Sequence, residues 1–106
     1  MAIKKIMLAC DASATTPLLV ATIEKAISAQ DKNVMVFATT SPHIDDKILS
    51  EQPSIVLLAP QLAYLKGEVK AQTDQVGVPL AVIQLNDFND MNGERILQLA
   101  ERFMYR

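Results

Sequence analysis

The chain contains few of the residues that usually carry out chemistry. Among its 106 residues are one cysteine, one histidine and three glycines, and tryptophan is absent. A disulfide within the chain is therefore impossible, and a zinc site built from several Cys and His ligands is excluded. The net charge is −2 and no basic cluster occurs, so we expect no nucleic-acid partner. We expect no metal and no cofactor either.

Long hydrophobic runs are also missing. The apolar stretch at residues 55–60 is far shorter than the ~18–20 residues that a membrane-spanning helix needs. The first residues lead into only five apolar positions before Asp11, so we predict no signal peptide. Half of the residues are hydrophobic, which is enough for a compact core. We therefore expect residues 1–106 to form a single domain, monomeric and cytoplasmic.

Short apolar runs alternate with segments of helical period along the chain. Runs typical of buried strands lie at residues 3–9, 34–37, 55–58 and 80–83. Helical spacing lies at 17–27, 42–50, 62–75 and 96–103. Pro17 suits a first helical turn, and Thr16 and Ser41 are expected to cap the first two helices. We read the polar stretch 86–92 as the entry loop of the last helix.

This alternation predicts an α/β fold with a small four-stranded parallel sheet and helices on both faces. Flavodoxin and the low-molecular-weight phosphatases have folds of this kind. Ligands of such sheets bind beyond the carboxyl ends of the strands, at the topological switch point. The segments that follow the strands, 10–17, 38–43, 59–62 and 84–93, are therefore where a site is expected.

Cys10 lies where the first predicted strand runs into the first helix. A free cysteine is often simply a small buried hydrophobic residue. At this position, however, unpaired backbone N–H groups and the positive end of a helix dipole favour the thiolate, which is the nucleophilic form. The same N–H groups would bind a phosphoryl group on the sulfur. The loop therefore suggests phosphoryl transfer or phosphate-ester chemistry.

Several families of thiol and phosphate-binding proteins do not fit the spacing. A small tyrosine phosphatase needs an arginine six residues after the cysteine, where Thr16 stands. A redox C-x-x-C motif needs a second cysteine in place of Ser13. A response-regulator receiver needs an aspartate at the end of the third strand, which closes on Leu58. The glycines lie outside any phosphate-binding glycine motif, so nucleotide binding is not expected.

The sequence resembles the lactose/cellobiose-specific enzyme IIB components of the bacterial sugar phosphotransferase system. The resemblance depends on Ile6-Met7-Leu8-Ala9-Cys10, on Thr15 and Thr16, and on the segment Val56-Leu57-Leu58-Ala59-Pro60-Gln61-Leu62-Ala63-Tyr64. The length and the four α/β units agree, so the likeness covers essentially the whole chain.

The resemblance implies a phosphocarrier function for Cys10. This residue would accept phosphate from a phosphohistidine on enzyme IIA and pass it to a disaccharide of the cellobiose, chitobiose or lactose class held by membrane enzyme IIC. The protein would be cytoplasmic and would associate with the inner face of the membrane through IIC. The phosphate-binding residues would be Asp11, Ala12, Ser13, Ala14, Thr15 and Thr16, and Gln61 and Tyr64 would flank the site across the crevice.

Two positions depart from the family pattern. Ser13 stands where the family usually has glycine, and a positive φ there would strain it by ~1–2 kcal/mol. Asp11 places a carboxylate beside the proposed phosphocysteine, and we expect it to cap the turn and point away. These departures keep open a non-catalytic binding or regulatory module, and Cys10 alone keeps open a thiol redox sensor.

Two other polar features have a simpler interpretation. His43 is the only imidazole able to relay a proton or phosphate, but a loop histidine is expected to be solvated. Asp45 and Asp46 are adjacent and point in different directions on a helix, so we expect a solvated face and no metal site.

Overall fold

A computed structural model describes residues 3–105 of the chain. The strands are β1 (Lys4–Ala9), β2 (Val34–Thr39), β3 (Ile55–Leu58) and β4 (Leu80–Val82). The α-helices are α1 (Thr16–Ala29), α2 (Ile44–Glu51), α3 (Lys66–Val76), α4 (Leu85–Asn89) and α5 (Gly93–Met104). Short 3₁₀ helices, η1 (Ser41–His43) and η2 (Pro60–Leu65), precede α2 and α3.

The strands form one parallel sheet in the order β2-β1-β3-β4, which confirms the predicted fold class. The order reverses between β1 and β3, so β1 lies in the middle of the sheet with β2 and β3 on its two sides. In the register of β1 and β2, Ala9 lies opposite Thr39. The segments that follow these two strands therefore leave the sheet side by side.

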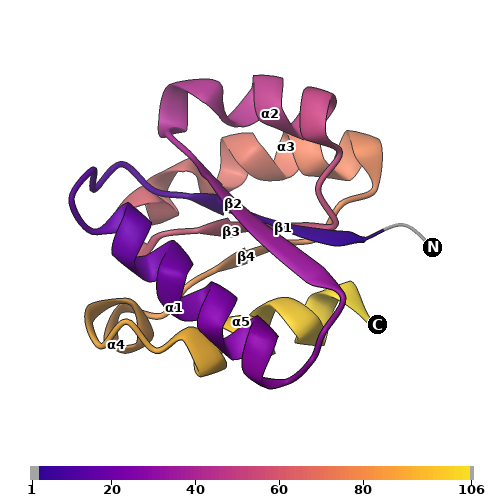
Figure 1. The fold of residues 1–106 in the computed structure, drawn as a ribbon. Helices are drawn as coiled ribbons and strands as arrows, with labels where there is room; N and C mark the ends of the chain where they lie inside the picture. Colours follow the sequence, from indigo (N-terminus) through magenta and orange to yellow (C-terminus); the bar gives the residue numbers. More distant parts are fainter. Residues whose placement is uncertain (1–2, 106) are drawn as a thin grey trace.

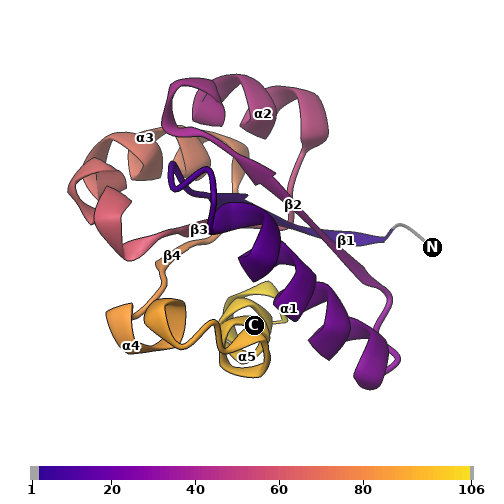
Figure 2. The same cartoon turned by 60° about the vertical axis from the view of Figure 1, so that its left-hand side comes forward.

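Helices cover both faces of the sheet, with α2 and α3 on one face and α1 and α5 on the other (Figure 1). The turned view shows α4 beside α5 (Figure 2). The side chains of β1 alternate between the two layers, as the pleat requires. Ile6, Leu8 and Cys10 belong to the core beneath α1 and α5, whereas Met7 and Ala9 belong to the core beneath α2 and α3.

The structure differs from the sequence prediction at the polar stretch 86–92. Part of this stretch forms the short helix α4, because Phe88 is buried in the core shared by α1 and α5. A single aromatic anchor therefore overrides the polar composition around it.

The predicted helix caps were wrong. The N-cap of α1 is Thr15, and the hydroxyl of Thr16 donates to the carbonyl of Ala12. Ser41 lies within η1, its hydroxyl donates to Asp11, and the N-cap of α2 is His43. Pro17 does lie in the first turn of α1, as predicted.

Between residues 3 and 105, no helix is both long enough and apolar enough to cross a membrane.

Candidate functional site

Cys10 lies at the carboxyl end of β1, where the chain leaves the sheet. Its N–H donates to the carbonyl of Thr39 at 2.9 Å, which extends the pairing of β1 and β2 by one step. The residue is only 2 % exposed, and its side chain faces the layer of α1. The backbone of Cys10 is therefore fixed to the end of β2, and its side chain is packed in the layer of α1 and α5.

A pocket of about 220 Å³ lies beside Cys10. It is lined by Cys10, Ser13, Thr16, Pro17, Ala38, Thr39 and Thr40. One wall comes from the loop after β1 and the first turn of α1, and the other comes from the end of β2. The described lining is made of thiol, hydroxyl and apolar groups, with no basic side chain among them.

The backbone of the loop after β1 is only partly hydrogen-bonded. The N–H groups of Thr15 and Thr16 both donate to the carbonyl of Ala12, at 3.0 and 2.8 Å. These two amides are therefore engaged within the loop. In the part of the chain that the structure describes, nothing accepts a hydrogen bond from the N–H groups of residues 11–14. These amides lie between Cys10 and the N-terminus of α1, and unpaired amides of this kind can bind an anion. Of the predicted phosphate-binding residues, only Ser13 and Thr16 line the pocket, whereas Ala12, Ala14 and Thr15 do not.

Ser13 has no backbone strain in this loop. Among the non-glycine residues between 3 and 105, a positive φ occurs only at Asp31, Gln52 and Met91. The left-handed conformation that would favour glycine is therefore not adopted at position 13. The absence of glycine from the loop carries no conformational cost here.

Asp11 makes its contacts away from the pocket. Its carboxylate accepts one hydrogen bond from the backbone N–H of Ser41 and one from the hydroxyl of Ser41, each at 2.7 Å. The side chain of Asp11 therefore caps the turn that follows β2. It does not cap the turn of its own loop, after β1. Asp11 does not line the pocket at Cys10.

The predicted crevice neighbours do not line this pocket. Gln61 and Tyr64 lie in η2, after β3, and Tyr64 is 76 % exposed. The pocket at Cys10 opens between the ends of β1 and β2, on the other side of β1 from β3.

Sequence reasoning missed the residues from the end of β2. The segment 38–43 was predicted to matter, but Ala38, Thr39 and Thr40 were not singled out. The sequence feature that points to them is the pair of consecutive threonines at the end of a predicted strand. That signal becomes informative only when β2 is known to lie beside β1.

The other polar candidates remain apart from Cys10. His43 is exposed at the end of η1, and Asp45 and Asp46 are exposed in the first turn of α2. Within residues 3–105, no group of three or more His, Cys, Asp or Glu side chains is placed to hold a metal ion.

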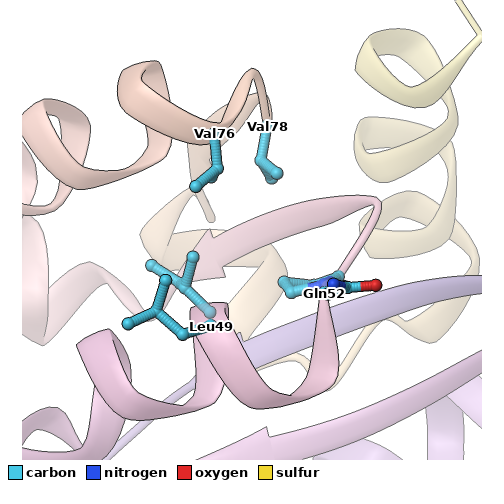
Figure 3. A pocket seen from close by; sticks show the side chains of 6 residues that line it. Leu49, Gln52, Val76 and Val78 are labelled. Atoms are coloured by element: carbon cyan, nitrogen blue, oxygen red, sulfur yellow. The ribbon is translucent and has the colours of Figure 1, made fainter.

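A larger pocket, of about 340 Å³, lies at the opposite end of the sheet (Figure 3). Leu49 and Gln52 from the end of α2 lie across from Val76 and Val78, close to where β3 and β4 begin. Ile48 and Pro53 complete the lining, in which Gln52 contributes the one polar side chain. This pocket offers no nucleophile and no charge, so the chemistry is assigned to the Cys10 end.

The fold and the thiol define the class of protein: a small parallel α/β domain with a cysteine between its first strand and first helix. Within that class, the chain belongs to the family described as PTS system, Lactose/Cellobiose specific IIB subunit, whose model matches residues 5–99. PTS denotes the sugar phosphotransferase system, so the protein is a component of such a system. The resemblance seen in the sequence is thereby confirmed.

Relatives match over nearly the full length. The galactose-specific EIIB component of Lactococcus lactis subsp. cremoris (strain MG1363) is 39 % identical, over 98 % of this chain and 99 % of its own. The cellobiose-specific EIIB component of Lactococcus lactis subsp. lactis (strain IL1403) has the same identity and coverage.

Solved structures share the fold. The cellobiose-specific IIB component of Borrelia burgdorferi superposes with a TM-score of 0.79 at 31 % identity, over 98 % of this chain and 94 % of that chain. The lactose-specific IIB domain of Streptococcus pneumoniae gives 0.80 at 17 % identity, over 96 % and 98 %, and this likeness is one of fold alone.

Proposed function

We propose that Cys10 carries the phosphoryl group in this IIB component. In the first step the sulfur attacks the phosphorus of a phosphohistidine. A P–S bond forms, the P–N bond breaks, and the leaving imidazole takes up the proton that the thiol gives up. In the second step a sugar hydroxyl attacks the same phosphorus. The P–S bond breaks, the cysteine is regenerated, and the hydroxyl proton is released.

The observation that carries this proposal is the position of Cys10 beside unpaired backbone amides. The N–H groups of residues 11–14 have no acceptor within the described chain, and α1 begins a few residues later. Such groups bind phosphoryl oxygens and stabilise the negative charge that develops during in-line transfer. Ser13, Thr16, Thr39 and Thr40 line the same pocket. The hydroxyls of Thr16 and Thr39 donate to backbone carbonyls, so those of Ser13 and Thr40 are the further donors for a phosphoryl group.

The lining of the pocket favours transfer over hydrolysis. No described residue of the lining is an arginine, a lysine or a general base. An enzyme that hydrolyses a phosphocysteine needs groups that bind the dianion tightly and activate water. The phosphoryl group on Cys10 therefore stays available to a second acceptor.

The partners follow from membership of the family. The donor is a phosphohistidine on enzyme IIA, because the chain's own His43 lies in η1 and does not line the Cys10 pocket. The acceptor is a disaccharide of the cellobiose, chitobiose or lactose class, held by membrane enzyme IIC. The chain acts as one IIB domain, a cytoplasmic monomer that meets IIC at the inner face of the membrane.

The test is phosphorylation by phosphoenolpyruvate, the general phosphotransferase proteins and a cognate IIA. One phosphate is expected on Cys10, located by mass spectrometry of the intact protein and of its peptides. The Cys10→Ser variant is expected to take up none. Label on another residue of the wild type, or equal label on the variant, contradicts the proposal.

A non-catalytic module was the main alternative, and it was motivated by Ser13 and Asp11. The carboxylate of Asp11 binds Ser41 and does not line the Cys10 pocket. The negative φ of Ser13 argues against strain in the loop. Transfer through Cys10 is therefore the function the site supports best.

A further inference from the structure

The side chain of Asp11 links two segments that are distant in the sequence. Its carboxylate oxygens each accept a hydrogen bond of 2.7 Å from Ser41, thirty positions further along the chain. Asp11 follows β1 by two residues and Ser41 follows β2 by two residues, so this pair continues the register in which Ala9 faces Thr39. We call these two hydrogen bonds the Asp11–Ser41 clasp.

The clasp lies outside the pocket of Cys10. Ser41 lines a separate small hollow together with Ile44, Leu65 and Val69, in the layer of α2 and α3. The side chain of Cys10 belongs to the opposite layer, beneath α1 and α5. The carboxylate of Asp11 therefore binds Ser41 on the face of the sheet that α2 and α3 cover, opposite to the face that the sulfur of Cys10 occupies.

The segments that the clasp joins are the two walls of the pocket. Cys10 comes immediately before Asp11, and Thr40 comes immediately before Ser41. Behind them, the N–H of Cys10 is bonded to the carbonyl of Thr39. Beyond the last strand residues, the separation of the two walls is thus set by that backbone bond and by the clasp.

We propose that Asp11 is a positioning residue for phosphoryl transfer, which holds the end of β2 against the Cys10 loop at the spacing the phosphoryl group requires. The inference rests on the proposed function of Cys10. The two Ser41 donors also draw the carboxylate away from the sulfur, which limits repulsion of the incoming dianion. Hydrogen bonds to a carboxylate are shorter and stronger than those between neutral groups, and two together fix direction as well as distance.

Three variants separate geometry from charge. Asp11→Ala removes both the clasp and the charge. Asp11→Asn removes the charge, but its amide oxygen still accepts from the N–H of Ser41 and its amide nitrogen still donates to the hydroxyl. Ser41→Ala keeps the charge and one hydrogen bond, that from the backbone N–H. Asp46→Ala is the control, because it removes an exposed carboxylate from the first turn of α2 that takes no part in the clasp.

The experiment measures the rate constant and the KM for transfer from phosphorylated IIA to Cys10, together with amide hydrogen exchange. We expect Asp11→Ala to lower the rate constant about tenfold with a change in KM below about threefold, because misplaced groups slow transfer more than they weaken docking. Asp11→Asn should recover at least a third of the wild-type rate, and Ser41→Ala should fall between the two. The amide of Ser41 should exchange faster in Asp11→Ala and stay protected in Asp11→Asn.

Each other result overturns the inference. Equal effects of Asp11→Ala and Asp11→Asn would show that charge alone acts. Unchanged transfer in Asp11→Ala and Ser41→Ala, or a Ser41 amide that exchanges equally in every variant, would remove the positioning role while Cys10 stays labelled. A wild type that takes up no phosphate on Cys10 contradicts the proposed function itself, and the positioning role falls with it.

Discussion

The α-carbon of Gly93 packs directly against the backbone of Thr22. Gly93 is the first residue of α5, and a Cβ at this position would collide with the carbonyl group of Thr22 in α1. The two helices cover the same face of the sheet, beneath which Cys10 and Leu8 lie. Glycine at this point is therefore a condition for the close approach of α1 and α5, and it holds the helix layer next to the site.

Gly93→Ala should lower the free energy of unfolding by about 2–4 kcal/mol, because backbone atoms of α1 must move to admit the methyl group. Urea denaturation measures the change. Gly67→Ala in α3 is the matched control, since a Cβ at Gly67 meets nothing within 4 Å. Alanine is the better helix former, so the control should gain between zero and about 1 kcal/mol. Equal midpoints for the two variants would contradict the close approach.

Ser13→Gly should slow phosphoryl transfer to Cys10. The φ of Ser13 is negative, so glycine relieves no strain, and it removes a hydroxyl that lines the pocket. Added freedom in the unfolded chain should also lower the free energy of unfolding by about 0.4–1 kcal/mol. The rate of phosphate uptake from phosphorylated IIA measures the first effect. Ser13→Ala separates loss of the hydroxyl from loss of rigidity, and a several-fold gain in Ser13→Gly would mean that the loop needs a left-handed residue after all.

Gln52→Gly should stabilise the fold. Gln52 ends α2 in the left-handed conformation, with φ 50°, which glycine adopts without a steric penalty. We expect a gain of about 0.5–1 kcal/mol in the free energy of unfolding. Gln30 ends α1 with φ −98°, so Gln30→Gly should instead lose a similar amount. Thermal and urea denaturation of the pair give the comparison, and a loss of stability in both variants is the adverse result.

The strands could be read from the sequence with close bounds. The apolar run at residues 55–58 is β3 residue for residue, because a strand buried on both faces needs only a short unbroken set of apolar side chains. The helix α4 could not be read in this way. Its five residues carry little helical signal, and it depends on the burial of Phe88 against residues far away in the chain.

Some residues of the candidate site could likewise be predicted from the sequence and others could not. Cys10 and the loop after it stand out locally, because a lone thiol between a strand and a helix is visible in a linear pattern. Thr39 and Thr40 did not stand out, and Gln61 and Tyr64 were expected where the end of β2 in fact lines the pocket. Whether these residues lie near Cys10 depends on which neighbour of β1 borders the pocket. The spacing of apolar residues does not specify the order of the strands in the sheet.

The sequence by itself determined the parallel α/β class, the approximate limits of the strands and the one cysteine at the end of β1. Each of these follows from the spacing of apolar residues and from residue type, which are local properties. Only the tertiary structure decided the rest. It turned the carboxylate of Asp11 toward Ser41, and it brought Thr39 and Thr40, at the end of β2, to Cys10. These contacts depend on register and on side-chain direction between segments about thirty residues apart, which only the folded sheet brings together.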